Sequence, residues 1–113
     1  MIDFSCQKFS IEEIIKCSLG LTKAELQIYI FLKQNNETEL TTEELAKKTK
    51  LNLSTVQRCV KKLHEEGILL RTQKNLNNGG YIFQYQFKSK ETVKKIIMNK
   101  VHNWVNMVEK EIV

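Results

Sequence analysis

Two helix start signals, at positions 41 and 52, constrain the fold more than any other feature of the sequence. At the first, Thr41 stands three residues before Glu44, which is the spacing of a capping box. The helix that follows is predicted to end near Lys48, and Asn52 is the expected cap of a second helix that stops at Gly67. Only the tetrapeptide TKLN separates them. Two helices joined by such a short turn form a helix-turn-helix motif.

The second helix of this motif, predicted over residues 53–66, separates apolar from polar side chains. Its apolar residues cluster within about 100° of a helical wheel: Val56, Cys59, Val60 and Leu63. Its polar face has these residues at its centre or flanks: Ser54, Thr55, Gln57, Arg58, Lys61 and Lys62. No acidic residue interrupts this face before Glu65. We expect the helix to bury one side and to present cationic and amide groups on the other.

After Gly67 the hydrophobic period changes from that of a helix to that of a strand. Residues 68–74 and 81–87 are predicted strands, and the intervening NLNNGG is the expected hairpin tip. The second strand alternates aromatic with other residues, its aromatic side being Tyr81, Phe83, Tyr85 and Phe87. We expect these rings to pack against the helices rather than to stack on nucleic-acid bases. A hairpin directly after the second helix of the motif is a wing, predicted over residues 68–87.

Two further helices are predicted before the helix-turn-helix. The first covers residues 11–19, with Ser10 as its cap and Gly20 as its stop. The second begins at a capping box of Thr22 and Glu25, and its residues are apolar on most sides. A helix of that kind lies at the centre of a core or contacts a second subunit.

The end of the chain, residues 89–113, is predicted to be one long helix capped by Ser89. Apolar residues recur along it every three or four positions: Val93, Ile97, Val101, Trp104 and Val108. A helix of about 22 residues spans roughly 33 Å, which is more than the preceding domain can cover. We therefore predict a homodimer in which this stripe pairs with its own copy. The alternative is that the helix folds back on the core of its own chain.

Length and charge fit one basic domain with an anionic partner. The 113 residues make one globular domain of common size, mainly α with a small β-hairpin wing. We divide it into a winged helix-turn-helix over residues 1–88 and a dimerisation helix over residues 89–113. Residues 1–50 hold seven lysines and eight acidic residues, whereas residues 51–113 hold eleven Lys and Arg against five Glu. The basic half indicates an anionic partner, with a solvated lysine-rich surface as the alternative.

Several other classes of protein are disfavoured. The chain has no run of about 18 apolar residues that could cross a membrane, and its first residues do not resemble a signal peptide, so we expect a cytoplasmic protein. No metal-ligand spacing, nucleophile motif or phosphate loop occurs, so we expect no enzyme, cofactor or metal. Cys59 is expected in the core. Cys6 and Cys17 could form a thiol switch, although two reduced thiols are the favoured interpretation.

The segments LGLTKAELQIYIFL and LTTEELAKKTKLNLSTVQRCVKKLHEEGIL, with the hairpin, resemble the winged helix-turn-helix domain of archaeal TrmB-type regulators. The second segment is typical of winged-helix regulators in general, including the MarR group. The resemblance covers about residues 11–87 and implies a transcription regulator that binds double-stranded DNA as a homodimer. The chain lacks the sugar-binding domain of full-length TrmB proteins. No sugar effector is therefore predicted, and a small-molecule effector remains unknown.

The polar face of the 53–66 helix is the predicted DNA interface. Arg58 can donate to guanine and Gln57 can pair with adenine in a major groove. Phosphate contacts are expected from Ser54, Thr55, Lys61 and Lys62, and in the wing from Arg71 and Lys74. Each residue alone is equally well explained as a solvated surface residue, so the prediction rests on the group. The alternative function is a winged-helix adaptor in a transcription or replication assembly.

Overall fold

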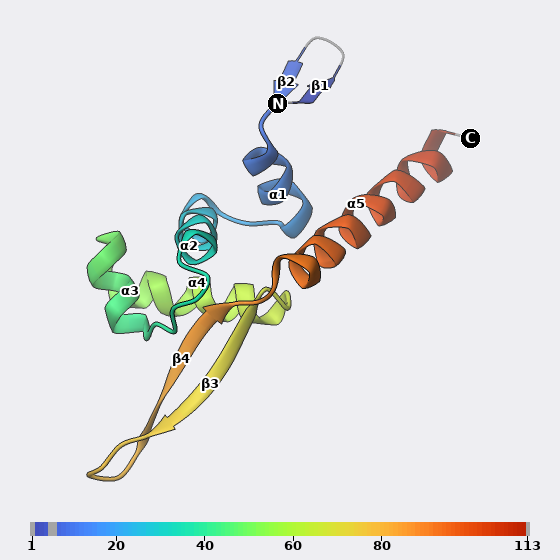
Figure 1. The fold of residues 1–113 in the computed structure, drawn as a ribbon. Coiled ribbons are helices and arrows are strands. Elements are labelled where there is room, and N and C mark those ends of the chain that lie inside the picture. Colours follow the sequence, from blue (N-terminus) through green and yellow to red (C-terminus); the bar gives the residue numbers. More distant parts are fainter. Residues whose placement is uncertain (1, 5–6, 113) are drawn as a thin grey trace.

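The computed structural model describes the backbone of residues 2–4 and 7–112 and the side chains of residues 10–112. Its elements follow the chain in this order: β1 (Ile2–Phe4), β2 (Gln7–Phe9), α1 (Ile11–Leu19), α2 (Lys23–Gln34), α3 (Thr42–Thr49), α4 (Leu53–Glu65), β3 (Leu69–Asn75), β4 (Tyr81–Phe87) and α5 (Lys90–Ile112). The predicted fold class is confirmed, because the fold is mainly helical with a β-hairpin and a long C-terminal helix. The molecule measures 62 × 24 × 23 Å, and its hairpin and α5 extend away from the helical body (Figure 1).

The helices begin at the predicted caps. Thr22 and Thr41 form complete capping boxes, and each hydroxyl accepts a hydrogen bond of 3.2 Å from the backbone N–H of Glu25 or Glu44. The carboxylates of these two glutamates accept in return from the backbone N–H groups of the threonines. The side chain of Asn52 caps α4. Local sequence therefore fixes where α2, α3 and α4 start.

The turn between α3 and α4 is short and tightly defined. The helix α3 ends at Thr49, one residue later than predicted, and residues 50–52 join it to α4. Lys50 adopts a left-handed conformation with φ of 62°, which ends α3 and redirects the chain. Two helices connected in this way match the predicted helix-turn-helix.

Buried side chains of α2, α3, α4 and the base of the hairpin pack together in one hydrophobic core. All four apolar residues predicted for the inner side of α4 are buried: Val56, Cys59, Val60 and Leu63. They join Ile28 and Leu32 of α2 and Leu45 of α3 in one cluster. Because α4 buries one whole side, its opposite side is held toward solvent.

The strands β3 and β4 form the predicted antiparallel hairpin, with Leu69 opposite Phe87 and Asn75 opposite Tyr81. At its base Phe87 is buried as expected, whereas Tyr81 near the tip is exposed, so the core interpretation is wrong for that residue. Leu40 adds a bridge to Tyr85, with backbone hydrogen bonds of 2.9 and 2.8 Å. The sequence did not predict this bridge, which attaches the base of the hairpin to the segment before α3.

The long helix α5 divides into two parts. Its first turns pack on the core of its own chain, where Val93 is only 4% exposed and Ile97 is half-buried. Farther along, the helix projects from the body (Figure 1), and Trp104 is 62% exposed. The first turns of α5 thus fold back on the core of their own chain, whereas pairing of the later turns with a second copy stays a prediction. Within the described ranges, no helix is both long and apolar enough to cross a membrane.

An additional short hairpin precedes α1. Its strands β1 and β2 are antiparallel, with Ile2 opposite Phe9 and Phe4 opposite Gln7. The sequence analysis predicted no element there. Cys6 lies outside the described residues, so the structure does not decide between a thiol switch of Cys6 with Cys17 and the favoured two reduced thiols.

Candidate nucleic-acid interface

The N-terminal turn of α4 is fixed by its cap. The carboxamide oxygen of Asn52 accepts from the backbone N–H of Thr55 at 2.9 Å and from the hydroxyl of Ser54 at 3.0 Å. Ser54 is exposed and Thr55 is half-buried. The cap thus orients the Ser54 hydroxyl at the end of the helix where backbone N–H groups favour an anion.

Three longer side chains continue this face along α4. Gln57, Arg58 and Lys61 are all exposed. Within the part of the chain that the structure describes, Arg58 and Lys61 make no ion pair, since both ion pairs there involve other residues. At 100° per residue, Arg58 and Lys61 lie on the side of α4 away from the buried Val56, and Gln57 lies at the flank of that side. The structure therefore brings together Ser54, Gln57, Arg58 and Lys61 on one solvent-facing side.

Lys62 has a different environment from Lys61. Its ammonium lies 3.2 Å from a carboxylate oxygen of Glu66, and Lys100 of α5 lies 3.4 Å from the other oxygen. Burial raises the pKa of Glu66, but hydrogen bonds and charges from the two lysines outweigh it, so the pKa is lowered overall. Lys62 thus helps to tie α4 to α5, and its charge is already partly compensated.

Replacing Glu66 with glutamine should reduce the free energy of unfolding by about 1 kcal/mol at neutral pH, because two partly exposed ion pairs are lost. A lowered folded-state pKa stabilises the protein above the ordinary value of 4.5. This contribution disappears as the pH falls through the folded-state value. Urea denaturation at neutral pH and at about pH 3 should show a smaller difference between wild type and variant at the lower pH. An equal loss at both values would contradict the ionic origin.

The two predicted wing cations lie on opposite faces of the hairpin. Arg71 stands opposite Tyr85 and Lys74 opposite Ile82, and successive strand residues alternate between faces. The guanidinium carbon of Arg71 lies 4.4 Å from the centre of the Phe83 ring, a cation–π contact. Positions 71 and 74 are three residues apart, and residues separated by an odd number of positions on a strand lie on opposite faces. The sequence spacing was therefore a signal that could have shown this separation. The structure does not unite these two residues in one surface.

The sequence interpretation missed an aromatic pair near the hairpin tip, in which Tyr81 is exposed and Phe83 is half-buried. The rings of Tyr81 and Phe83 meet edge to face at 5.3 Å, and Arg71 covers Phe83. The alternation of aromatic residues in the sequence indicated that these rings share one face of the strand. The sequence did not indicate how far along the strand the hairpin leaves the core.

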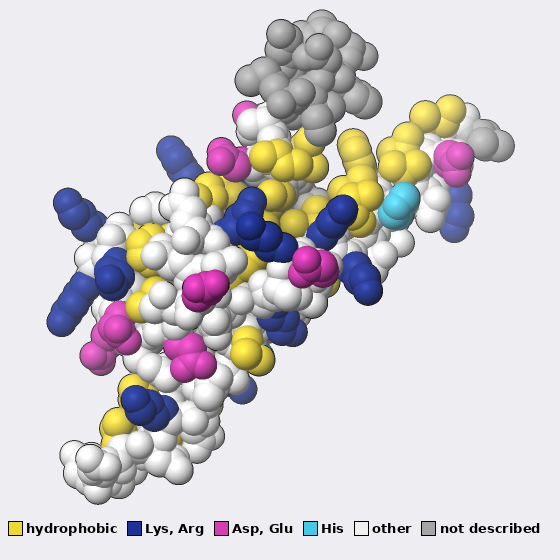
Figure 2. Space-filling model, viewed as in Figure 1, with side chains coloured by type: hydrophobic (Ala, Val, Ile, Leu, Met, Phe, Trp, Pro, Cys, Tyr) yellow, Lys and Arg dark blue, Asp and Glu magenta, His cyan; other side chains and the backbone are white. Residues whose placement is uncertain are grey.

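Figure 2 shows that Lys and Arg side chains are distributed around the helical body among acidic ones, without one continuous basic patch on this face.

Neither the possible metal ligands nor the cysteines among the described residues form a reactive centre near α4. Among them, no group of three or more His, Cys, Asp or Glu side chains is arranged to hold a metal ion. Cys59 is buried, as predicted, and Cys17 is exposed. Burial, and secondarily the charge of Glu25, raises the pKa of the Cys59 thiol against the opposing effect of Arg58. A thiol of that kind is a poor nucleophile at neutral pH.

The capped helix pair, the hairpin that follows it and the Leu40 bridge define a winged-helix-like domain. Comparison with known families identifies the chain more closely. The DnaD N-terminal domain family matches residues 9–108, and the chain belongs to that family.

Related proteins come from several archaea. A structure described as a possible transcriptional regulator from Methanosarcina mazei Go1 is 44% identical in sequence and has a TM-score of 0.92. The match covers 99% of this chain and 93% of that one. The uncharacterized protein MJ1082 of Methanocaldococcus jannaschii is 30% identical over 92% of this chain and 84% of its own length. A second protein of that organism, MJ1503, is 28% identical over 93% of this chain and 78% of its own length.

A more distant structure shares the fold alone. The ST1889 protein from Sulfolobus tokodaii has a TM-score of 0.70 at 23% identity, over 86% of this chain and 93% of that one. Its agreement with the present structure at such low identity shows that the architecture tolerates extensive sequence change.

Proposed function

We propose that the protein is a transcription regulator that binds double-stranded DNA as a homodimer, rather than an enzyme. The observation that carries the proposal is the exposed face of α4, where Arg58 and Lys61 are held outward by a fully buried underside. A helix of this kind, following a short turn and preceding a wing, is suited to a major groove. The 44% identical structure from Methanosarcina mazei, described as a possible transcriptional regulator, supports it.

The side chains of α4 divide into two roles in this proposal. Arg58 and Gln57 offer donors and acceptors that match base edges, guanine for the first and adenine for the second. Ser54, Thr55 and Lys61 are placed for phosphate, whereas Lys62 is a weaker candidate because Glu66 already pairs with it. In the wing, Lys74 is the phosphate candidate, and Arg71 is oriented by Phe83 toward the opposite face.

Replacing Arg58 with alanine should weaken binding to the preferred operator by about 1–3 kcal/mol and relax the preference at one base pair. Replacing Lys61 should weaken all sequences alike and reduce the slope of log affinity against log salt by about 1. Fluorescence anisotropy with the protein's own upstream DNA and a scrambled duplex measures both effects.

The control for these variants is Lys110→Ala, which removes an exposed lysine near the end of α5. It should leave affinity and salt slope unchanged. If all three variants bind like wild type, or if the wild type binds both duplexes equally, α4 does not read base sequence.

The dimer in this proposal forms through the projecting part of α5. Its exposed or half-buried apolar residues from the predicted stripe are Val101, Trp104 and Val108. Val93 and Ile97 of the same stripe pack on their own core, so the interface proposed here uses the later part of the stripe. Two recognition helices would then enter successive major grooves about 34 Å apart on a pseudo-palindromic operator. A closer relation to TrmB-type regulators is part of the same proposal.

The second candidate is a protein-interaction adaptor, and the match to the DnaD N-terminal domain family suggests a replication-related role for it. The observation that favours this candidate is the same exposed apolar part of α5, which could bind a different protein. Light scattering after size exclusion distinguishes the two, because a homodimer supports the regulator and a monomer supports the adaptor.

A further inference from the structure

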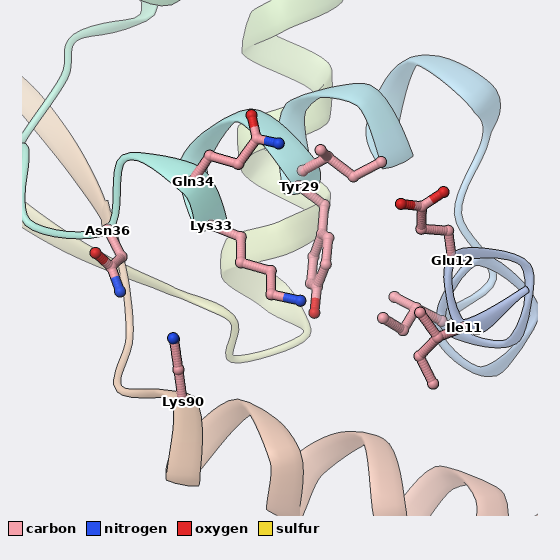
Figure 3. A pocket seen from close by; sticks show the side chains of 9 residues that line it. Ile11, Glu12, Tyr29, Lys33, Gln34, Asn36 and Lys90 are labelled. Atoms are coloured by element: carbon pink, nitrogen blue, oxygen red, sulfur yellow. The ribbon is translucent and has the colours of Figure 1, made fainter. Parts of the chain in front are cut away.

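A cavity of about 380 Å³ lies between α1, α2 and the beginning of α5, away from the outer face of α4 (Figure 3). Its apolar lining comes from Ile11 and Ile15 of α1 and Ile30 of α2. Polar groups from α2 and α5 complete it, among them Tyr29, Lys33 and Lys90. A concave site that combines apolar side chains with polar groups able to fix orientation suits a small molecule.

Tyr29 gives this cavity a specific hydrogen-bonding group. The residue is only 3% exposed, and its ring packs edge to face against Phe87 at 5.3 Å. Its hydroxyl lies in the cavity, beside the end of the Lys33 side chain (Figure 3). A buried tyrosine usually satisfies its hydroxyl with a partner. Among the described residues no enclosed side-chain polar atom lacks a partner, so this hydroxyl is open to solvent, where a group that enters the cavity can accept its hydrogen bond.

The charges around the cavity are unequal at its two ends. Lys33 ends beside the Tyr29 hydroxyl, Lys90 points from α5 toward Asn36, and Glu12 stands on the α1 side (Figure 3). Lys90 is also the first residue of α5, whose N-terminal end contributes a partial positive charge. One end of the cavity thus favours an anion, and the other end disfavours a second one.

We propose that this cavity binds a small monocarboxylate with a short apolar chain. The carboxylate lies between Lys33 and Lys90 and accepts a hydrogen bond from the Tyr29 hydroxyl. The chain follows the isoleucines toward α1, where Glu12 discriminates against a second negative charge. This proposal does not depend on DNA binding, and it assigns the cavity a ligand that bridges the helices α1, α2 and α5.

The test uses the full chain without DNA and hexanoate as the probe in isothermal titration calorimetry. Hexanoate should bind saturably at one site per chain. Adipate, which replaces the terminal methyl group with a second carboxylate, and hexanol, which lacks the charge, should each bind about tenfold more weakly or not at all.

Two variants and a matched control assign the contacts. Lys33→Gln should weaken hexanoate binding about tenfold, and Tyr29→Phe should weaken it severalfold while keeping the buried ring. Lys47→Gln removes an exposed lysine of α3 outside the cavity and should bind like wild type. Circular dichroism confirms that each variant is folded. Absence of saturable binding, equal binding of adipate, or unchanged affinity in Lys33→Gln would overturn the proposal.

Discussion

Replacing Leu63 with alanine is expected to lower the free energy of unfolding by about 3–4 kcal/mol. Leu63 is 0% exposed and lies on the inner side of α4, in the cluster that also contains Ile28 and Leu32 of α2. Truncation removes the transfer free energy of the side chain and leaves a cavity between packed helices. Because a domain of this size is stable by only about 5–15 kcal/mol, the loss is a large fraction of the total.

The matched control is Leu53→Ala in the same helix. Leu53 is 39% exposed at the first position of α4, so its truncation should cost less than about 1 kcal/mol. Urea denaturation followed by circular dichroism measures both variants, and an unchanged slope with denaturant indicates that the unfolded state is comparable. Equal losses in the two variants would mean that α4 is not anchored through its inner side.

The helix starts could be predicted from the sequence because their determinants are local. Thr22 and Thr41 are each followed three residues later by a glutamate, and both reciprocal hydrogen bonds form within four residues of chain. The inner side of α4 was predictable for a similar reason, since the period of its apolar residues identifies the face that must be buried.

Contacts between elements distant in sequence could not be predicted in the same way. The Glu66 carboxylate joins Lys62 of α4 to Lys100 of α5, and no local pattern specifies that α5 passes there. The bridge between Leu40 and Tyr85 likewise depends on where the hairpin docks. The Glu66 contact changed the interpretation of the candidate site, because it compensates the charge of the predicted phosphate-binding Lys62.

The point at which α5 leaves the body was also beyond the sequence pattern. The apolar stripe continues without interruption from Val93 to Val108, although the first turns are covered by their own chain and the later ones are not. Periodicity shows that a face is apolar, but it does not show what covers it. The point at which α5 becomes uncovered depends on how far the helical body extends along it.

The second large effect is expected from the projecting part of α5. Trp104→Glu combined with Val108→Glu should convert the proposed homodimer into a folded monomer, because two carboxylates would be buried in an apolar interface. Both side chains are substantially exposed in the single chain, so the monomer itself should remain stable. Light scattering after size exclusion measures the mass, and circular dichroism checks the fold.

The same double variant should bind a two-half-site operator about 10²–10⁴-fold more weakly than wild type, because the second recognition helix is no longer held at high effective concentration. Binding to a single half-site should be little changed, since α4 is untouched.

The matched control adds two carboxylates at His102 and Asn106, which lie on the opposite side of the helix at 100° per residue. That control should remain dimeric. A monomeric wild type, or full operator affinity in a monomeric variant, would contradict dimerisation through α5 and favour the adaptor.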